Sequence, residues 1–372
     1  MIPFAKPYFD EQDVNDALER IRAVLVSGWL TSGPSVKRFE EAFSQAVGTK
    51  QCVAVNSCTA ALHAILLALG IGEGDEVVVP ANTFVATANA AVYTGAKPVF
   101  ADTDPDTFNV SYADVKKRLS RRTKAIVAVH LGGNPCDMDE LKTIADERGI
   151  ALLEDCAHAH GAFYQSKPCG TLGVAGAFSF YPTKVMTAGE GGMIVTNNEE
   201  VAKQCRLIRN QGRGGYGPLE IVTLGYNFRM PDILAELGLI QLRHLDEFVR
   251  KRNEVAAFYN KELQGIPWIK PQLVKKGNRS SYYAYILELN PEHIERDSFA
   301  ERLLKEGIQT SVLYHPVHLQ PLYKERFGHR PGELPNAELQ GRATIALPMY
   351  NSITMEDART VTEAVKRVAR VS

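Results

Sequence analysis

The sequence predicts an α/β fold, with a mostly parallel central sheet covered by helices on both faces and a smaller C-terminal α+β domain. Short, continuously apolar runs recur between residues 51 and 197, and helix-patterned segments separate several of them. Runs of Val and Ile without polar alternation are typical of strands buried on both faces, which occur in parallel sheets. After Pro267 the pattern changes, and strands and helices alternate in a shorter region.

In chain order, two helix-patterned segments come first, at 11–26 and 34–46, separated by the turn SGWLTSGP. Helices there are indicated by apolar residues at three- and four-residue spacing. Seven strands are then expected: CVAV (52–55), EVVVP (76–80), KPVFAD (97–102), KAIVAVH (124–130), IALLED (150–155), AFSFY (177–181) and GMIVT (192–196).

A long helix is expected from Pro231 to Leu263, because proline suits the first turn of a helix. The remaining pattern gives a strand (SYYAYILELN), a helix (RDSFAERLLKEG), another strand and a last helix from Met355. We therefore expect a large domain at 1–265, which includes the long helix, and a small domain at 266–372.

Composition excludes several classes of function. The 372 residues carry a formal net charge of −1, so nothing draws the chain generally to nucleic acid or to an anionic membrane. The six cysteines are scattered without a Cys-x-x-Cys pair, which indicates free thiols rather than disulfides or a metal site. The N-terminus lacks a signal-peptide pattern, and the longest apolar segment, Ala60 to Ile71, is too short to cross a bilayer. A cytoplasmic protein without a metal ion is expected.

The segment AFSFYPTKVMTAGEGGMIVT contains the first candidate for chemistry, Lys184. It lies between two strands of buried type, and the only other charge in the segment is Glu190. Most lysines are solvated surface charges, and that reading stays open. Desolvation lowers the pKa of a lysine, however, and Schiff-base chemistry with a carbonyl group requires such a lysine.

The segment IALLEDCAHAHGA contains the second candidate, Asp155, at the carboxyl end of a very apolar strand. A helix cap or a local salt bridge would also explain an aspartate there. Pyridoxal chemistry needs a carboxylate that stays ionised against the pyridinium nitrogen of the cofactor. Asp155 and Lys184 both follow strands, and open α/β sheets bind ligands at the carboxyl ends of their strands.

The segment VNSCTAALHAIL reads as a strand, a turn of small residues and a helix. Ser57 or Thr59 is expected to cap that helix. A helix N-terminus with small residues also suits a phosphate group, and both interpretations can hold together. The turn is not a Gly-x-Gly-x-x-Gly motif, which argues against a dinucleotide-dependent dehydrogenase.

These segments, in this order, resemble the sugar aminotransferase family of fold-type I pyridoxal-phosphate (PLP) enzymes, also called the DegT/DnrJ/EryC1/StrS family. The resemblance runs from SGWLTSGP to ALPMYNSITMEDARTV and rests on EDCAHAHGA, FSFYPTK…GEGGMIVT, LGYNFRMPDILAELGLIQL and HPVHLQPLY. It implies a fold type I PLP-transferase with aminotransferase activity in amino-sugar or polysaccharide biosynthesis. L-glutamate is the implied donor, a nucleotide-linked keto-sugar the acceptor, and a homodimer with shared active sites the active unit.

The resemblance also assigns roles to residues. It makes Lys184 the Schiff-base and proton-transfer residue, and it makes Asp155 the partner of the pyridine nitrogen. Further cofactor contacts are implied for Thr59, Ala60 and Ser179 at the phosphate, Phe84 on the ring, His158 at the phenolic oxygen, and Asn227 at the phosphate of a neighbouring subunit. Thr31, Arg229 and His318 lie in segments that border the substrate in relatives.

Two residues depart from the pattern of relatives. Cys58 stands where a glycine is common, so the phosphate turn must accommodate a side chain. His158 stands where many relatives have glutamine, which leaves its charge state open.

The position of amination depends on one stretch. LGYNFRMPDILAELG resembles 4-aminating relatives, which have an aromatic residue and then arginine after the asparagine, more than 3-aminating ones. Amination at C4 of a 4-keto-6-deoxy hexose is therefore expected, with Phe228 as the discriminating residue, although simple packing of Phe228 is equally consistent. A 3-keto-sugar or a keto-cyclitol is the alternative acceptor. A sugar dehydratase would have histidine in place of Lys184, and a regulatory protein would have lost Lys184 or Asp155.

Overall fold

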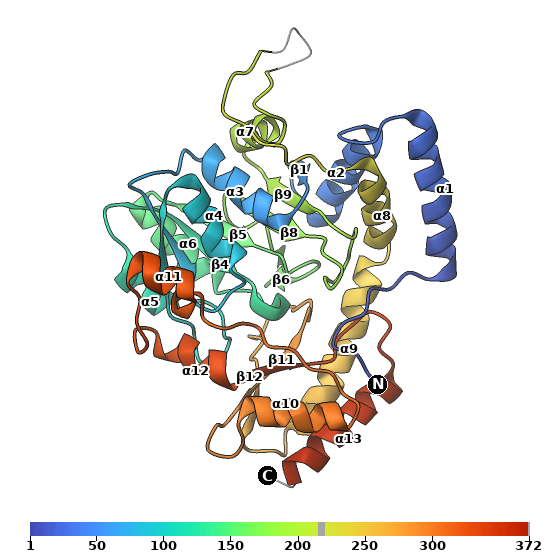
Figure 1. Cartoon of the computed structure of the whole chain (residues 1–372), viewed down its shortest axis with the longest axis vertical. Coiled ribbons are helices and arrows are strands. Elements are labelled where there is room, and N and C mark those ends of the chain that lie inside the picture. Colours follow the sequence, from blue (N-terminus) through green and yellow to red (C-terminus); the bar gives the residue numbers. More distant parts are fainter. Residues whose placement is uncertain (215–219, 371–372) are drawn as a thin grey trace.

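The computed structural model describes residues 1–214 and 220–370, and a seven-stranded sheet forms its centre (Figure 1). The strand order is β1-β9-β8-β5-β4-β2-β3. The strands are β1 (Gln51–Val55), β2 (Glu76–Pro80), β3 (Lys97–Ala101), β4 (Thr123–Val129), β5 (Ala151–Asp155), β8 (Ala175–Ser179) and β9 (Gly192–Thr196). All seven expected strands are present. Strand β9 runs antiparallel to β1 and β8, whereas the pairs from β8 through β3 are parallel, which confirms the mostly parallel sheet.

Helices cover both faces of this sheet. Strand β2 has apolar side chains on both faces: Val77 and Val79 pack in one apolar cluster, and Val78 packs in another. The first cluster includes residues of α3 (Cys58–Ala68), α4 (Ala86–Thr94) and α7 (Glu199–Arg209). The second includes residues of α5 (Tyr112–Arg118) and α6 (Met138–Arg148). A strand without polar alternation therefore buries both of its faces, as the sequence predicts.

The expected N-terminal helices are α1 (Glu11–Ser27) and α2 (Pro34–Val47). The prediction of a single long helix from Pro231 to Leu263 is wrong, because this stretch forms two helices. They are α8 (Asp232–Leu242) and α9 (Leu245–Leu263). The break coincides with contacts to α1, where His244 Nε2 lies 2.9 Å from Asp13 Oδ1 and Arg243 donates to Asp16 over 2.8 Å.

A second, three-stranded antiparallel sheet lies in the C-terminal region and has the order β10-β11-β12. Its strands are β10 (Ile269–Pro271), β11 (Tyr285–Leu289) and β12 (Thr344–Leu347), and its helices are α10 (Arg296–Lys305) and α13 (Met355–Arg370). Val255 and Tyr259 of α9 belong to the same apolar cluster as this sheet. Helix α9 therefore packs with the C-terminal sheet as well as leading to it. A short hairpin of β6 (Phe163–Tyr164) and β7 (Lys167–Pro168) lies apart from both sheets.

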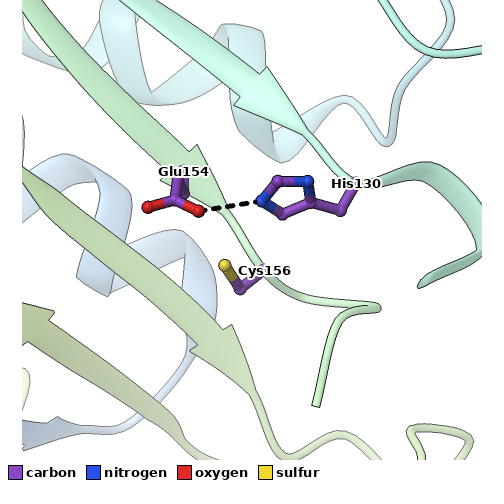
Figure 2. Close-up of side chains that lie close together, drawn as sticks. All are labelled: His130, Glu154 and Cys156. Carbon is purple, nitrogen blue, oxygen red and sulfur yellow. Dashed lines mark hydrogen bonds and ion pairs between the residues drawn. The ribbon is translucent and has the colours of Figure 1, made fainter. Parts of the chain in front are cut away.

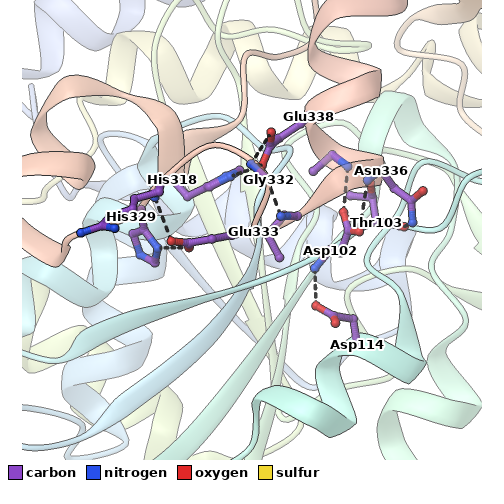
Figure 3. Close-up of polar contacts among 12 residues, drawn as sticks. Asp102, Thr103, Asp114, His318, His329, Gly332, Glu333, Asn336 and Glu338 are labelled. Carbon is purple, nitrogen blue, oxygen red and sulfur yellow. Dashed lines mark hydrogen bonds and ion pairs between the residues drawn. The ribbon is translucent and has the colours of Figure 1, made fainter.

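Part of the C-terminal region returns to the central sheet. It comprises α11 (Pro321–Phe327) and α12 (Pro335–Ala343), which the sequence analysis did not predict. Figure 3 shows how α12 is held: Asp102, directly after β3, accepts the backbone N–H of Ala337 over 2.7 Å, and Asn336 donates to the Thr103 carbonyl over 3.1 Å. A carboxylate from the large sheet thus satisfies the N-terminus of a C-terminal helix.

Among the residues that the structure describes, no helix has the length and apolar character needed to cross a membrane.

Candidate active site

A cavity of about 510 Å³ lies at the carboxyl ends of the central strands. Its wall includes residues that follow β1, β2, β5 and β8, which is the location that the sequence predicts for a ligand. The C-terminal region adds Tyr283 and the segment 311–314. The lining residues are Phe4, Ser57, Cys58, Thr59, Leu62, Thr83, Phe84, Ala86, Val129, Asp155, Ala157, His158, Ser179, Tyr181, Thr183, Lys184, Glu190, Tyr283, Ser311, Val312, Leu313 and Tyr314.

Lys184 reaches this cavity from a turn that follows β8. The turn is closed by a hydrogen bond of 3.0 Å from the Lys184 N–H to the Tyr181 carbonyl. The Nζ of Lys184 lies 4.5 Å from the centre of the Tyr283 ring. The amine therefore lies against an aromatic face inside the cavity.

Asp155 lies at the end of β5 and is 5% exposed. Its Oδ2 accepts a hydrogen bond from the Thr87 hydroxyl over 2.7 Å, and its Oδ1 accepts the Ala157 N–H over 3.0 Å. Burial raises the pKa of Asp155, while these two hydrogen bonds and the charge of Lys184 act in the opposite direction. A further cation in the cavity would favour the ionised form. This carboxylate therefore fits the protonated ring nitrogen of PLP.

The turn before α3 offers a place for the phosphate. Ser57 is the N-cap of α3, and its hydroxyl accepts the Ala60 N–H over 3.1 Å. Thr59 and Ser179 line the cavity beside this turn, whereas the methyl group of Ala60 is buried away from it. Gly192 underlies the turn, because a Cβ there would come within 2.5 Å of the Ser57 carbonyl carbon. A helix N-terminus with hydroxyl groups at the cavity fits a phosphate group.

Cys58 occupies the turn without blocking it. Its side chain is buried, and its Sγ lies 3.5 Å from the Ala177 carbonyl and 4.0 Å from Asp155. Burial, reinforced by the charge of Asp155, raises the pKa of the thiol well above its usual value. Cys58 is therefore an uncharged part of the wall.

His158 is held between two tyrosines. Its ring stacks on Tyr283 at 4.0 Å, and its Nε2 lies 3.1 Å from the Tyr314 hydroxyl. Its Nδ1 accepts the Gly132 N–H over 3.3 Å, so the Nε2 carries the proton and donates to Tyr314. Burial lowers the pKa of His158 well below its usual value. The structure thus answers the question that the sequence leaves open, and His158 is a neutral donor.

Phe84 lines the cavity and is 56% exposed, with its ring 5.7 Å from that of Tyr314. Taken alone, a phenylalanine in an apolar segment would be expected in the core. Only the family resemblance predicts that Phe84 contacts the cofactor ring.

Besides Ala60, four residues expected at the cofactor or substrate lie outside the described lining of this cavity. The Asn227 carbonyl accepts from Asn56 over 3.3 Å, Arg229 donates to Asn210 over 3.0 Å, and the Thr31 hydroxyl donates to the Met230 carbonyl over 3.3 Å. These three lie close to residues 210 and 227–231, at the foot of the described residues 210–214 and 220–226, which extend above α7 (Figure 1). His318 is fully buried, 3.3 Å from Glu338 and beside Phe100 (Figure 3). Within one chain, His318 therefore has a packing role.

A second, buried group of chemically active side chains is formed by His130, Glu154 and Cys156 (Figure 2). The Glu154 carboxylate accepts the N–H groups of Gly170, Leu172 and Gly173, each over 2.7 Å, and it lies 3.1 Å from His130 Nε2. The His130 Nδ1 accepts the Cys136 N–H over 3.0 Å, so the Nε2 is the donor to Glu154. Protein partners therefore already use both ring nitrogens of His130 and the carboxylate of Glu154.

Four residues of the site are not predicted from the sequence: Thr83, Thr87, Tyr283 and Tyr314. Thr83 and Thr87 lie in the same PANTFVAT stretch that supplied Phe84, four residues apart, which is a spacing that places side chains on one helical face. Tyr283 and Tyr314 come from the C-terminal region, and nothing local in their segments indicates a contact with Lys184 or His158.

Comparisons with known proteins agree with this geometry. The sequence model of the DegT/DnrJ/EryC1/StrS aminotransferase family matches residues 11–366. The spore coat polysaccharide biosynthesis protein SpsC of Bacillus subtilis is 38% identical, over 99% of this chain and 97% of its own. The PLP form of Spr1654 from Streptococcus pneumoniae, described as a sugar aminotransferase, matches with a TM-score of 0.93 and 31% identity, over 100% of this chain and 99% of its own.

A third similar protein is PseC of Helicobacter pylori, an aminotransferase involved in the biosynthesis of pseudoaminic acid. It matches with a TM-score of 0.93 and 29% identity, over 100% of both chains. The fold, the cavity and these matches agree, and this chain belongs to the DegT/DnrJ/EryC1/StrS family of PLP-dependent sugar aminotransferases.

Proposed function

We propose that this enzyme transfers an amino group from L-glutamate to C4 of a nucleotide-linked 4-keto-6-deoxy hexose. The observation that carries the proposal is that Lys184 and Asp155 line one cavity beside the N-terminus of α3. This places an amine, a buried carboxylate and a phosphate-binding turn within one site. In the net reaction glutamate becomes 2-oxoglutarate, and the keto carbon of the sugar comes to carry the amine.

Each residue contributes a separate part. PLP, when bound, withdraws electrons from the carbon that carries the amino group. Lys184 holds the cofactor covalently and moves the proton at the reacting carbon, and Asp155 keeps the ring nitrogen protonated. Ser179 and Thr59 hold the phosphate together with the N-terminus of α3, where the Ala60 N–H is shared with the Ser57 hydroxyl. At the phenolic oxygen, the His158 N–H donates to the Tyr314 hydroxyl, and that hydroxyl in turn donates to the oxygen of the cofactor.

The sugar substrate is supported by the relatives and by the cavity. SpsC is named for polysaccharide biosynthesis, and PseC is described as acting in the biosynthesis of pseudoaminic acid. Phe84 and Tyr181 line the cavity and are 56% and 47% exposed. Exposed aromatic faces at a concave site are suited to stacking on flat or apolar faces of ligands.

The position at C4 is supported by the segment GYNFR. Within one chain, the Phe228 ring stacks on Tyr226 at 4.9 Å and lies 5.8 Å from the His63 ring. The Phe228 carbonyl also accepts the Asn56 N–H over 2.9 Å. These contacts fix the backbone on both sides of Phe228, so Asn227 and Arg229 are presented in a fixed arrangement. The residue thus acts by packing, and the C4 assignment depends on the resemblance of the segment to 4-aminating relatives.

The test is to incubate the enzyme and L-glutamate, under equal conditions, with UDP-, GDP- and dTDP-linked 4-keto and 3-keto sugars, with a keto-cyclitol and with simple keto acids. Mass spectrometry detects the amine, and NMR locates it. We expect a 4-keto-6-deoxy sugar to be aminated fastest. Faster amination of a 3-keto sugar or a keto-cyclitol would contradict C4 and leave the aminotransferase assignment intact. If the enzyme aminates simple keto acids but none of the keto-sugars, the proposal that its acceptor is a sugar is wrong.

We also propose a homodimer with shared active sites. Asn227 is not among the residues that line the cavity of its own chain, and the nearby side chains of Ile221 and Leu224 are 57% and 78% exposed. Helix α1 and the turn after it also expose apolar side chains, among them Leu18, Leu25 and Trp29. Large apolar side chains exposed at these two places support a protein interface there. A second copy of the chain would cover them and bring Asn227 to its cavity.

A further inference from the structure

Arg252, on α9, is buried in an unusual way. It is 2% exposed, and it is one of the largest fully buried side chains of the protein. Four hydrogen bonds lead from its guanidinium to neutral oxygens, which belong to the side chain of Asn351 (2.9 Å) and the carbonyls of Tyr282 (2.9 Å), Tyr283 (3.3 Å) and Met349 (3.1 Å). Burial lowers the pKa of Arg252 to about 10, so the group is still charged at neutral pH. A buried charge that is compensated by neutral oxygens is costly, which calls for a specific role.

Asn351 extends this arrangement to the segment of Lys184. Its Oδ1 accepts from Arg252 Nε over 2.9 Å, and its Nδ2 donates to the Val185 carbonyl over 2.9 Å. Val185 follows Lys184 directly in the chain. Asn351 is 5% exposed, and because its two ends face opposite partners, its amide has one orientation. The backbone next to Lys184 is therefore tied to Arg252 through one side chain.

Arg252 also holds the surface against which Lys184 lies. It binds the carbonyls of Tyr282 and Tyr283, which flank the Cα of Tyr283, and the Tyr283 ring is the one that lies 4.5 Å from Lys184 Nζ. The same ring stacks on His158 at 4.0 Å, and its hydroxyl lies 3.2 Å from the Thr183 hydroxyl. Arg252 is thus connected to both sides of the Lys184–Tyr283 contact.

We propose that Arg252 and Asn351 form a positioning pair that holds the Lys184 amine against the face of Tyr283. This inference rests on the role proposed above for Lys184. A lysine side chain has four rotatable bonds, and proton transfer requires the amine to lie within a few tenths of an ångström of its productive place. The pair fixes the backbone of Lys184 from one side and the ring from the other. Neither Arg252 nor Asn351 lines the cavity, so both act through Lys184 and Tyr283.

Asn351→Asp separates positioning from simple support of the fold. The carboxylate still accepts from Arg252 and places an anion beside the buried guanidinium, but it cannot donate to the Val185 carbonyl when ionised. Arg252→Lys is the second variant, since it keeps the charge and loses the fork of donors. Tyr259→Phe is the matched control. The Tyr259 hydroxyl donates to the Pro348 carbonyl over 3.0 Å. This hydrogen bond also joins α9 to the loop after β12, but it does not involve the segment of Lys184.

The experiment compares the PLP-loaded wild type and these variants in three respects: the pH midpoint of the visible absorbance, the split between kcat and KM for L-glutamate, and the thermal unfolding midpoint. We expect Asn351→Asp to lower kcat roughly 10- to 100-fold, the scale that small misplacements of reacting groups cost, with KM nearly unchanged. The absorbance midpoint should shift as well. Tyr259→Phe should change neither, although it too loses a buried hydrogen bond.

Two results would overturn the positioning pair. One is that Asn351→Asp folds and matches Tyr259→Phe in absorbance midpoint and kcat. The other, which decides the matter if Asn351→Asp does not fold, is the same match for Arg252→Lys. Borohydride reduction of the wild type is done first. If the cofactor is not attached to Lys184, the proposed function fails, whereas attachment followed by unaffected variants contradicts the positioning pair alone.

Discussion

The hydroxyl of Thr87 donates a hydrogen bond of 2.7 Å to Oδ2 of Asp155. Thr87 also lies 2.9 Å from the hydroxyl of Thr83, and because its own proton points at Asp155, Thr83 is the donor between them. The two hydroxyls therefore form a directed chain that ends on the carboxylate. This chain favours the ionised form of Asp155, against the burial that raises its pKa.

Thr87→Val removes this support while keeping the shape of the side chain. The pKa of Asp155 should rise further, and the acid limb of the kcat profile should move to higher pH because the carboxylate must be ionised to work. A hydrogen bond to a charged group is worth about 1.5–3 kcal/mol, so kcat near neutral pH should fall roughly tenfold or more. Thr87→Ser keeps the hydroxyl and should retain the wild-type profile. An unchanged acid limb in Thr87→Val would mean that Thr87 does not act on Asp155.

Asp155→Asn tests the carboxylate itself. The change keeps the size of the side chain and removes the charge that holds the ring nitrogen protonated. We expect kcat to fall by roughly 10²–10³, the scale of a lost electrostatic partner. Asp139→Asn is the control, because the Asp139 carboxylate accepts from the Tyr164 hydroxyl away from the cavity. Its kcat should be nearly unchanged. A loss of less than about threefold in Asp155→Asn would count against the assignment.

Much of the fold follows from the sequence because its signals are local. The segments EVVVP and GMIVT match β2 and β9 to the residue, since strands buried on both faces are continuously apolar. The break between α8 and α9 could not be predicted, because the contact between His244 and Asp13 joins residues 231 positions apart. Segments α11 and α12 were missed for a related reason, as Asp102 of the large sheet caps α12.

The residues of the candidate site also fall into two groups, those that local motifs predict and those that only tertiary contacts bring to the cavity. Four residues of the cavity lie in motifs that can be recognised in the sequence: Lys184, Asp155, His158 and Phe84. Tyr283 reaches Lys184 from 99 positions away, through a contact that has no local pattern. The protonation state of His158 depends on the Gly132 N–H, which also comes from another segment. Tertiary contacts of this kind cannot be read from a single segment.

His160 makes stability depend on pH. Burial, with a smaller effect of Lys184, lowers the pKa of His160 from 6.5 to about 3. Between these values the unfolded chain binds a proton that the folded chain does not, so the free energy of unfolding falls as the pH falls. His160→Leu should flatten this dependence by up to about 1.4 kcal/mol per pH unit. Urea unfolding at several pH values between 4 and 7 measures it, and parallel curves for the two proteins would contradict the shift.

Mixing two inactive variants tests the shared sites. Lys184→Ala and Asn227→Ala chains should each be inactive alone, and heterodimers should contain one site in which both residues are intact. Equal mixing of two chains in a dimer gives about half heterodimers, so about a quarter of the sites should work. Subunit exchange is verified by native mass spectrometry. If exchange occurs and activity does not return, each chain forms its own complete site.

The attachment of the cofactor to Lys184 is the central claim, and one measurement tests it directly. The PLP-loaded protein is reduced with borohydride, digested and mapped by mass spectrometry, with Lys184→Ala treated in parallel. We expect the wild type to carry the reduced cofactor on the peptide that contains Lys184, and Lys184→Ala to carry none. Attachment to another lysine, or full turnover by the Lys184→Ala protein, would contradict the account.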